Sequence, residues 1–178
     1  MARYGMLINT KKCVGCYSCR IACQMYNGLS PDEMFIKFYE EERGQYPSVY
    51  AENIPVQCMH CEDAPCQSVC PTTATYTTES GVVLVDEGKC IGCKYCMAAC
   101  PYDARIQLQP SGVVEKCRFC WTDGEPGNPP KCVGTCISGA RIFGDLDDPE
   151  SEISKEIARM NAQPLAGDLT KAKIYYVR

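Results

Sequence analysis

Four groups of cysteines dominate this sequence. The stretch CVGCYSCRIAC, residues 13–23, places four thiols within eleven positions and contains no histidine, aspartate or glutamate. Such a density indicates a disulfide scaffold in small secreted chains and a metal site in other proteins. The sixteen cysteines are Cys13, Cys16, Cys19 and Cys23 in the first group, Cys58, Cys61, Cys66 and Cys70 in the second, Cys90, Cys93, Cys96 and Cys100 in the third, and Cys117, Cys120, Cys132 and Cys136 in the fourth.

The spacing within the groups points to iron–sulfur chemistry. The third group reads C-x2-C-x2-C-x3-C-P and ends at Pro101, and the first group has the same cysteine spacing. A tight loop of this kind presents three thiolates to one cluster, and in two-cluster ferredoxins the fourth thiolate binds the other cluster. The second and fourth groups read C-x2-C, a spacer, and C-x3-C. The spacer of the fourth group is the Gly/Pro-rich loop WTDGEPGNPPK.

The two kinds of group alternate in an internal repeat. YGMLINTKKCVGCYSCRIAC, from Tyr4, aligns with GVVLVDEGKCIGCKYCMAAC, from Gly81, at a constant offset of 77 residues. In each copy a short β-rich run, Met6–Ile8 or Val82–Val85, ends in a polar turn before the first cysteine. The order of the groups is therefore A-B-A-B, which predicts two related units.

Crossed ligation follows from this spacing. The fourth cysteine of each group lies a helical turn beyond its own loop, so a second loop, related by pseudo-twofold symmetry, is expected to share it. We therefore predict four [4Fe-4S] clusters. Their ligands are Cys13, Cys16, Cys19 and Cys136 for cluster 1, Cys117, Cys120, Cys132 and Cys23 for cluster 2, Cys58, Cys61, Cys66 and Cys100 for cluster 3, and Cys90, Cys93, Cys96 and Cys70 for cluster 4.

Other uses of the cysteines fit the pattern less well. A structural zinc ion takes two C-x2-C pairs and leaves no role for a third cysteine two residues on. Disulfides join distant loops, whereas these thiols are clustered along the chain. A c-type haem needs C-x-x-C-H, and the single histidine, His60, lies inside C-M-H-C. A zinc-stabilised interaction module remains the alternative from another class, and iron–sulfur absorption would distinguish the two.

Basic residues gather at the cysteine groups. Four clusters would add a charge of about −8 to a chain whose formal net charge is −4, and buried charge needs nearby cations and donors. A lysine directly precedes the first cysteine of three groups, and another precedes Cys132. We expect compensation of the cluster charge from Lys12, Lys89, Lys116 and Lys131, together with Arg20, Lys94 and Arg118.

The remaining segments predict supporting elements. MFIKFYEEERGQYP reads as a strand followed by a surface loop, and KIYYV as a final docking strand. DLDDPESEISKEIARM reads as a helix with Asp148 as N-cap and Pro149 at the first helical position. The opening MARYGMLINT has no charged region followed by an apolar run, and no stretch approaches the ~18 apolar residues of a membrane span. We therefore expect neither a leader nor a span.

The sequence contains no set of residues typical of a catalytic site, and its net negative charge provides no basic surface for nucleic acid.

The fold class we predict is α+β, as two interleaved bacterial-ferredoxin-like modules with pseudo-twofold symmetry, rich in loops and organised around the four clusters. The expected divisions are an outer module of residues 1–27 plus 110–145, an insertion of residues 28–54, an inner module of residues 55–109, and a C-terminal docking tail of residues 146–178.

These features resemble a known family over nearly the whole chain. CVGCYSC, QCMHCEDAPC, KCIGCKYCMAACPYDAR, EKCRFC and FGDLDDPES together are similar to the four-cluster iron–sulfur subunits of molybdopterin oxidoreductases, such as polysulfide, thiosulfate and dimethyl sulfoxide reductases. Nitrate reductase relatives have tryptophan at the place of Cys93, so the cysteine implies a complete cubane here. Ile137 follows Cys136, where many relatives have proline.

The resemblance implies a non-catalytic electron-transfer subunit with two partners. One is a large catalytic subunit with molybdenum or tungsten, expected at the outer module, and the other is a quinone-reactive membrane anchor, expected at cluster 4. It also implies attachment to the membrane through partners, on the extracytoplasmic face, because several family members are exported folded with a signal-bearing partner. The alternative within this class is a cytoplasmic hydroxylase or dehydroxylase complex without an anchor.

Overall fold

The computed structural model describes residues 2–121 and 128–178 as an α+β protein with several small sheets. Three strands pair in the order β8–β1–β9, and the pairs β2–β3, β4–β5 and β6–β7 form hairpins. The strands are β1 (Tyr4–Asn9), β2 (Lys37–Gln45), β3 (Ser48–Val56), β4 (Thr75–Thr77), β5 (Val83–Val85), β6 (Arg105–Gln107), β7 (Val114–Lys116), β8 (Arg141–Asp145) and β9 (Ile174–Val177). Residues 122–127 of the predicted Gly/Pro-rich loop lie outside the described residues.

Short helices accompany each cysteine group. The helices are α1 (Ser18–Asn27), α2 (Pro65–Ser68), α3 (Tyr95–Ala98), α4 (Lys131–Gly134) and α5 (Glu152–Met160), with 3-10 turns η1 (Thr10–Lys12) and η2 (Gly167–Leu169). Prolines stand directly after the last cysteines of the second and third groups, where they prevent further helix. The first group has no such proline, and α1 continues through Cys23 to a left-handed Gly28 cap.

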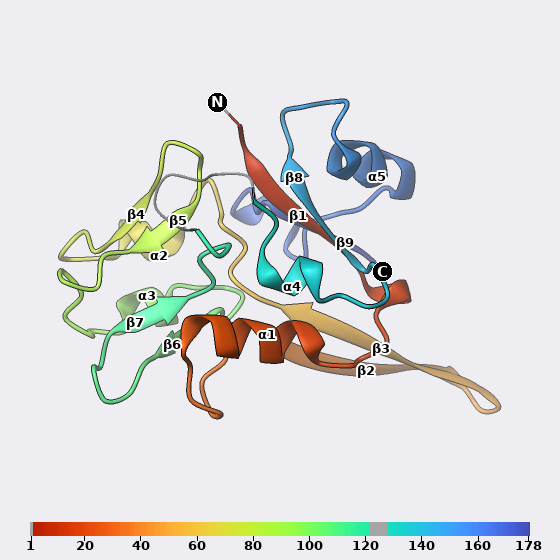
Figure 1. Cartoon of the computed structure of the whole chain (residues 1–178), viewed down its shortest axis with the longest axis horizontal. Coiled ribbons are helices and arrows are strands. Elements are labelled where there is room, and N and C mark those ends of the chain that lie inside the picture. The colour runs from red at the N-terminus through yellow and green to blue at the C-terminus, as the bar shows by residue number, and fades with distance from the viewer. Residues whose placement is uncertain (1, 122–127) are drawn as a thin grey trace.

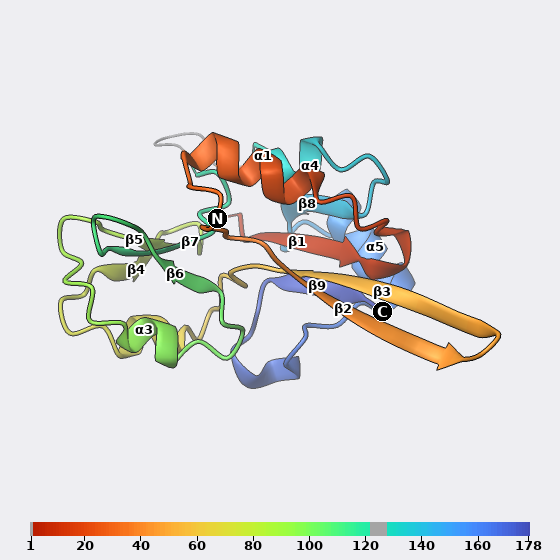
Figure 2. The same ribbon diagram turned by 90° about the horizontal axis from the view of Figure 1, so that it is seen from below.

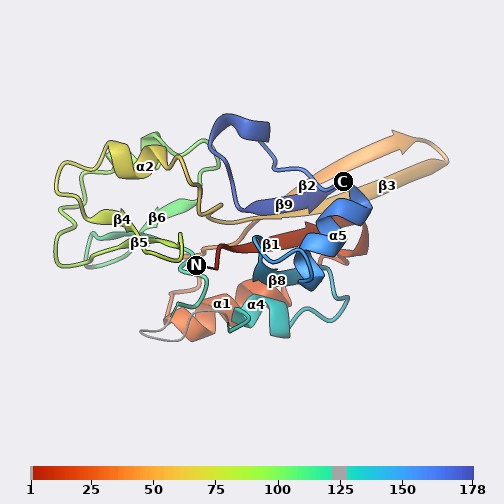
Figure 3. The same cartoon turned by 90° about the horizontal axis from the view of Figure 1, so that it is seen from above.

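The elements divide into two lobes (Figure 1). One lobe contains β4–β7 with α2 and α3, and the other contains the β8–β1–β9 sheet with α1, α4 and α5. Figure 2 shows α1 and α4 on one side of β1, and α1 packs on α4 as α2 packs on α3. The β2–β3 hairpin projects away from both lobes, as Figure 3 also shows. Helices of the first and fourth groups are thus neighbours, and so are those of the second and third.

The repeated β-rich runs form strands, as the sequence predicts. β1 lies in the middle of its sheet, antiparallel to β8 and parallel to β9, and its residues from Gly5 to Asn9 are buried. The second copy contributes β5, which pairs with β4. The predicted final strand is confirmed as β9, which places Ile174 beside Met6. The segments before the first and third cysteine groups are therefore anchored by strands.

Two predictions about local structure are corrected. The acidic part of MFIKFYEEERGQYP is strand, not loop, because β2 runs through it to Gln45 and pairs with β3 along its whole length. The last long helix begins three residues later than expected. Ser151 is its N-cap and accepts a hydrogen bond from the Ser154 N–H at 3.3 Å. Asp148 instead accepts from the Glu150 N–H at 2.9 Å, in a turn before the helix.

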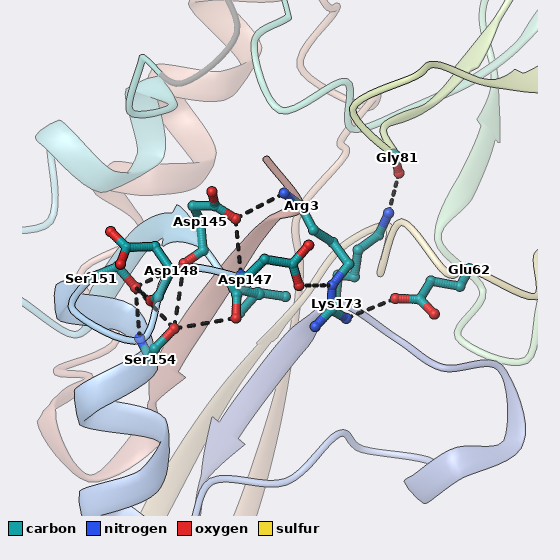
Figure 4. A network of polar contacts seen from close by, with 10 residues as sticks. Arg3, Glu62, Gly81, Asp145, Asp147, Asp148, Ser151, Ser154 and Lys173 are labelled. Carbon is teal, nitrogen blue, oxygen red and sulfur yellow. Dashed lines mark hydrogen bonds and ion pairs between the residues drawn. The ribbon is translucent and has the colours of Figure 1, made fainter. Parts of the chain in front are cut away.

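A polar network joins the two lobes (Figure 4). Arg3, just before β1, contacts Asp147 Oδ1 at 2.8 Å in its own lobe and Glu62 Oε1 at 2.7 Å in the other. The buried Lys173 donates from Nζ to the carbonyl oxygen of Gly81. Since Lys173 directly precedes β9, the three-stranded sheet and the β4–β5 hairpin are held at a fixed relative position.

Cysteines form much of the interior. One core cluster spans both lobes and includes eight buried cysteines together with apolar residues such as Met6, Ile36 and Val83. Removing apolar side chains and thiols from water stabilises this core, but the thiols also place reactive groups at its centre. Within residues 2–121 and 128–178, every helix is too short or too polar to span a membrane.

Candidate iron–sulfur centres

Two pockets are each lined by four cysteines from two different groups. One contains the four cysteines predicted for cluster 4, and the other the four predicted for cluster 1. The two pockets are similar in size, as expected for related sites. Their cysteines are Cys70, Cys90, Cys93 and Cys96 in the first, and Cys13, Cys16, Cys19 and Cys136 in the second. The fold therefore brings these two sets together.

Electrostatics group the other eight thiols in the same way. Burial raises the pKa of the Cys61 thiol to about 11, and the thiols of the other three residues predicted for cluster 3 raise it further: Cys58, Cys66 and Cys100. Burial also raises the pKa of Cys23 to about 12, with further contributions from Cys132 and Cys120. Burial, followed by the thiols of Cys23 and Cys132, likewise raises the pKa of Cys117. Both neighbourhoods contain thiols from two groups that are distant in sequence. The ligand sets themselves remain predictions.

Left-handed residues shape the repeated loops. Gly15 and Gly92, one offset of 77 apart, have φ of 62° and 66°. Tyr17 and Lys94 also match, with φ of 58° and 65°, and each precedes a helix. A Cβ on Gly92 would come within 2.7 Å of the Gly112 carbonyl oxygen. These positions let the loop turn sharply so that three sulfurs face one side.

Backbone amides point at several of the sulfurs. The N–H groups of Phe119, Ala140 and Val114 donate to the Sγ atoms of Cys117, Cys136 and Cys90, at 3.4, 3.2 and 3.5 Å respectively. A donor stabilises negative charge on sulfur, whether as free thiolate or as cluster ligand. These amides are placed to donate to sulfur atoms that carry negative charge as ligands of a bound cluster.

The predicted lysines differ in position. Lys116 is fully buried and donates from Nζ to the carbonyl oxygens of Val83 and Cys117. Lys12, Lys89 and Lys131 are exposed. Position next to a cysteine therefore does not determine burial, because burial depends on which other segments cover the side chain.

Two buried arginines that lie beside the cysteines were not predicted from the sequence. Arg105 and Arg141 line the two cysteine pockets and are 2% and 4% exposed. Each stands five residues after the last cysteine of a group, at the end of the sequences CPYDAR and CISGAR. This shared offset of 36 residues was the available signal, and it indicates that the third and fourth groups end alike.

His60 lies where the lobes meet. It is fully buried, and its ring stacks on Phe119 with centroids 3.8 Å apart. The two residues hold the same place in the second and fourth groups, each one before the second cysteine. His60 Nδ1 accepts from the Val83 N–H at 3.2 Å, and burial lowers the pKa of the imidazole well below its ordinary value. A neutral aromatic pair therefore joins the loops of these two groups.

Solvent access differs among the four predicted sets. The sets for clusters 1 and 4 each contain one exposed cysteine, Cys16 and Cys93, which are equivalent in the repeat. Beside them stand the exposed and equivalent Val14 (63%) and Ile91 (68%). The sets for clusters 2 and 3 contain buried and half-buried cysteines. The protein thus has two accessible ends and a buried middle.

The residues fit [4Fe-4S] clusters. Each pocket supplies four thiols, cationic arginine and nearby amide donors, which is the donor set that a buried anionic cluster requires. In the described ranges, no three histidine, cysteine, aspartate or glutamate side chains lie in an arrangement that could hold a single metal ion.

Comparisons with known proteins agree with this chemistry. The 4Fe-4S dicluster domain matches residues 49–146. The sequence is 38% identical to one of the chains of the polysulfide reductase of Wolinella succinogenes over 180 residues, which cover 98% of this protein and 94% of the relative. It is 40% identical to the thiosulfate reductase electron transfer subunit of Salmonella typhi over 160 residues, with coverages of 88% and 82%.

A third relative is matched over less of its own length. One of the subunits of the tetrathionate reductase of Salmonella typhimurium is 42% identical over 155 residues, which cover 85% of this protein and 62% of the relative. The chain therefore belongs to the family of iron–sulfur electron-transfer subunits of molybdopterin reductase complexes.

Proposed function

We propose that this subunit carries four [4Fe-4S] clusters in two interleaved ferredoxin-like modules and relays electrons between a molybdopterin catalytic subunit and a quinone-reactive membrane anchor. The clusters would supply one-electron transfer. The observation that most directly supports this proposal is the pattern of solvent exposure. Cys16 and Cys93 are exposed at equivalent places, whereas the cysteines predicted for clusters 2 and 3 are buried or half-buried. A relay needs access at both ends and none in the middle.

Neighbouring contacts support the order of the four sets. Arg141 lies in one pocket with Cys19 and approaches the Cys132 sulfur, and these cysteines are predicted ligands of clusters 1 and 2. The His60–Phe119 stack connects the loops of clusters 3 and 2. Arg105 similarly lies near thiols predicted for clusters 3 and 4. These contacts support the order 1, 2, 3, 4 through the protein.

Exposed apolar residues support docking at the two ends. Val14, Met25 and Ile137 surround the Cys16 end, and Ile91 and Tyr95 surround the Cys93 end. Apolar surface around a solvent-accessible redox ligand is typical of a contact site for a partner. By analogy with the family, we assign the Cys16 end to the catalytic subunit and the Cys93 end to the anchor. Attachment to the membrane would then occur through partners, on the extracytoplasmic face.

Purification of the full chain, alone and with its partners, tests this proposal. Anaerobically purified protein should contain about sixteen irons and a similar number of sulfides. Dye-linked substrate reduction should appear only with the large subunit, and quinol coupling only with the anchor. Zinc with little iron would overturn the cluster assignment, and turnover by the isolated chain would overturn the relay. Full activity in a complex that has no anchor would favour the cytoplasmic alternative.

A further inference from the structure

Arg105 is a buried cation without an ordinary partner. Arg105 is the first residue of β6 and is 2% exposed. It lines the pocket of Cys90, Cys93 and Cys96. Both terminal nitrogens, Nη1 and Nη2, are buried and donate to no atom in the described part of the protein. An isolated buried charge is strongly disfavoured, so a native structure that retains one implies a counter-charge at the same place.

Arg141 occupies the matching position in the other lobe. It is 4% exposed, and its Nη1 donates to Gln57 Oε1 at 2.7 Å and approaches Cys132 Sγ at 3.8 Å. Its Nη2 is buried and has no acceptor among the described residues. The polar contacts of this guanidinium are thus a neutral amide and the sulfur atoms of Met6 and Cys132.

Each arginine stands between two predicted clusters of one module. Arg105 lines the pocket that contains Cys96 and lies close to the thiol of Cys66 in the second group. Arg141 lines the pocket that contains Cys19 and approaches Cys132 Sγ at 3.8 Å. In both modules the arginine thus approaches the third cysteine of both groups. Those two cysteines belong to different predicted clusters.

The chemistry of arginine suits a shared position. A planar guanidinium offers donors on more than one edge and keeps its charge when buried, whereas an ammonium acts as a point charge. Sulfur atoms of a cluster accept hydrogen bonds, and such bonds, together with nearby positive charge, favour the reduced cluster.

We infer that Arg105 and Arg141 are shared counter-charges, each placed between the two clusters of one module, and that each raises the reduction potentials of both clusters of its own module. The inference rests on the four clusters of the proposed function, but it concerns their potentials and not their partners. Arg105 would act on clusters 3 and 4, and Arg141 on clusters 1 and 2.

Redox titration of the full, anaerobically purified chain, followed by electron paramagnetic resonance, tests the inference. Arg105→Gln should lower the potentials of clusters 3 and 4 together, each by at least tenfold in the reduction equilibrium constant, or 59 mV for one electron. Clusters 1 and 2 should change by less than that. Arg141→Gln should give the opposite pattern. A shift of one cluster alone, or of none, would overturn the inference.

Lys94→Gln is the matched control. Lys94 lines the same pocket as Arg105 but is exposed, so water screens its charge. Its removal should shift cluster 4 by less than Arg105→Gln does and should leave cluster 3 unchanged. Equal shifts in both variants would show that any nearby cation suffices and would overturn the shared role.

Loss of iron from Arg105→Gln would also be decisive. The inference then requires that the loss is confined to the two clusters of one module, about eight irons. Loss of one cluster alone, or loss spread over all four clusters, would overturn it. Iron and sulfide in the unaltered chain are measured first, so a failure of the four-cluster proposal is recognised before any arginine variant is compared.

Discussion

The ends and the middle of this protein use similar cysteine loops in opposite environments. Cys16 and Cys93 are exposed at the ends, whereas Cys58, Cys61 and Cys117 are buried where the lobes meet. The ends have apolar side chains such as Val14 and Ile91 in solvent, and the middle has the stacked rings of His60 and Phe119. One kind of local loop can therefore serve as a contact point or as an internal site, depending on what covers it.

Burial also changes what each cysteine contributes to stability. A buried thiol belongs to the common core of both lobes, so its cluster and the surrounding packing are expected to depend on each other. An exposed thiol at an end touches little of that core. Substitutions in the two regions should therefore differ in how far their effects spread.

The largest expected effect comes from removing a ligand in the middle. Cys117→Ser should lose more than one cluster, because Cys117 is 7% exposed, lies near Cys23 and Cys132, and accepts from the Phe119 N–H. Cys16→Ser at an exposed end should affect cluster 1 alone and leave about twelve irons. Iron analysis and resistance to chymotrypsin measure the two outcomes. Equal iron loss in both variants would remove the distinction between end and middle.

A large effect on stability is expected at Lys116. Lys116→Met leaves the carbonyl oxygens of Val83 and Cys117 without their donor and should lower the free energy of unfolding by about 2–4 kcal/mol. Lys12→Met is the matched control, since both lysines directly precede the first cysteine of a group but Lys12 is exposed. Its effect should stay within about 0.5 kcal/mol. Urea unfolding measures both, and equal losses would contradict the prediction.

A smaller, selective effect is expected at the exposed ends. Val14→Glu should weaken binding of the catalytic subunit at least tenfold, or about 1.4 kcal/mol, because a charge must then be buried at the contact. Ile91→Glu, the equivalent substitution at the other end, should leave this affinity unchanged and weaken attachment of the anchor. Titration of each partner with the loaded chain measures both affinities. Weakening of both partners by either variant would contradict the assignment of the ends.

The smallest expected effect lies in the projecting hairpin. Glu52 is 8% exposed and accepts from Thr10 Oγ1 at 2.7 Å, and it pairs with Arg178 and Arg43 at 3.1 and 3.0 Å. The Arg178 hydrogen bond is the main cause that lowers the pKa of this carboxyl group, against the effect of burial. Glu52→Gln should therefore cost about 1 kcal/mol at neutral pH.

The pH dependence follows from the direction of that pKa. A carboxyl group whose pKa is lowered in the folded state stabilises the protein above its ordinary pKa, and this contribution is lost as the pH falls through the folded value. The difference in thermal stability between the unaltered chain and Glu52→Gln should be constant from about pH 8 to 5 and shrink below about 4.5. A difference that grows towards acid would contradict the role of the carboxylate.

The sequence determined the local chemistry. Cysteine spacing predicted loops that gather thiols, and the offset of 77 residues related the first and third groups, whose strands and left-handed positions the structure also shows. These features depend on residues within a few positions of one another, so the order of the side chains is enough to predict them.

Tertiary structure decided which charges are buried. Lys12 and Lys116 stand at the same place before a first cysteine, yet only Lys116 meets the carbonyl oxygen of Val83, from a strand distant in sequence. Arg105 and Arg141 also gain their positions from segments far along the chain. Burial is a property of packed surfaces and not of local order, so sequence spacing could locate the thiols but could not show which cations lie beside them.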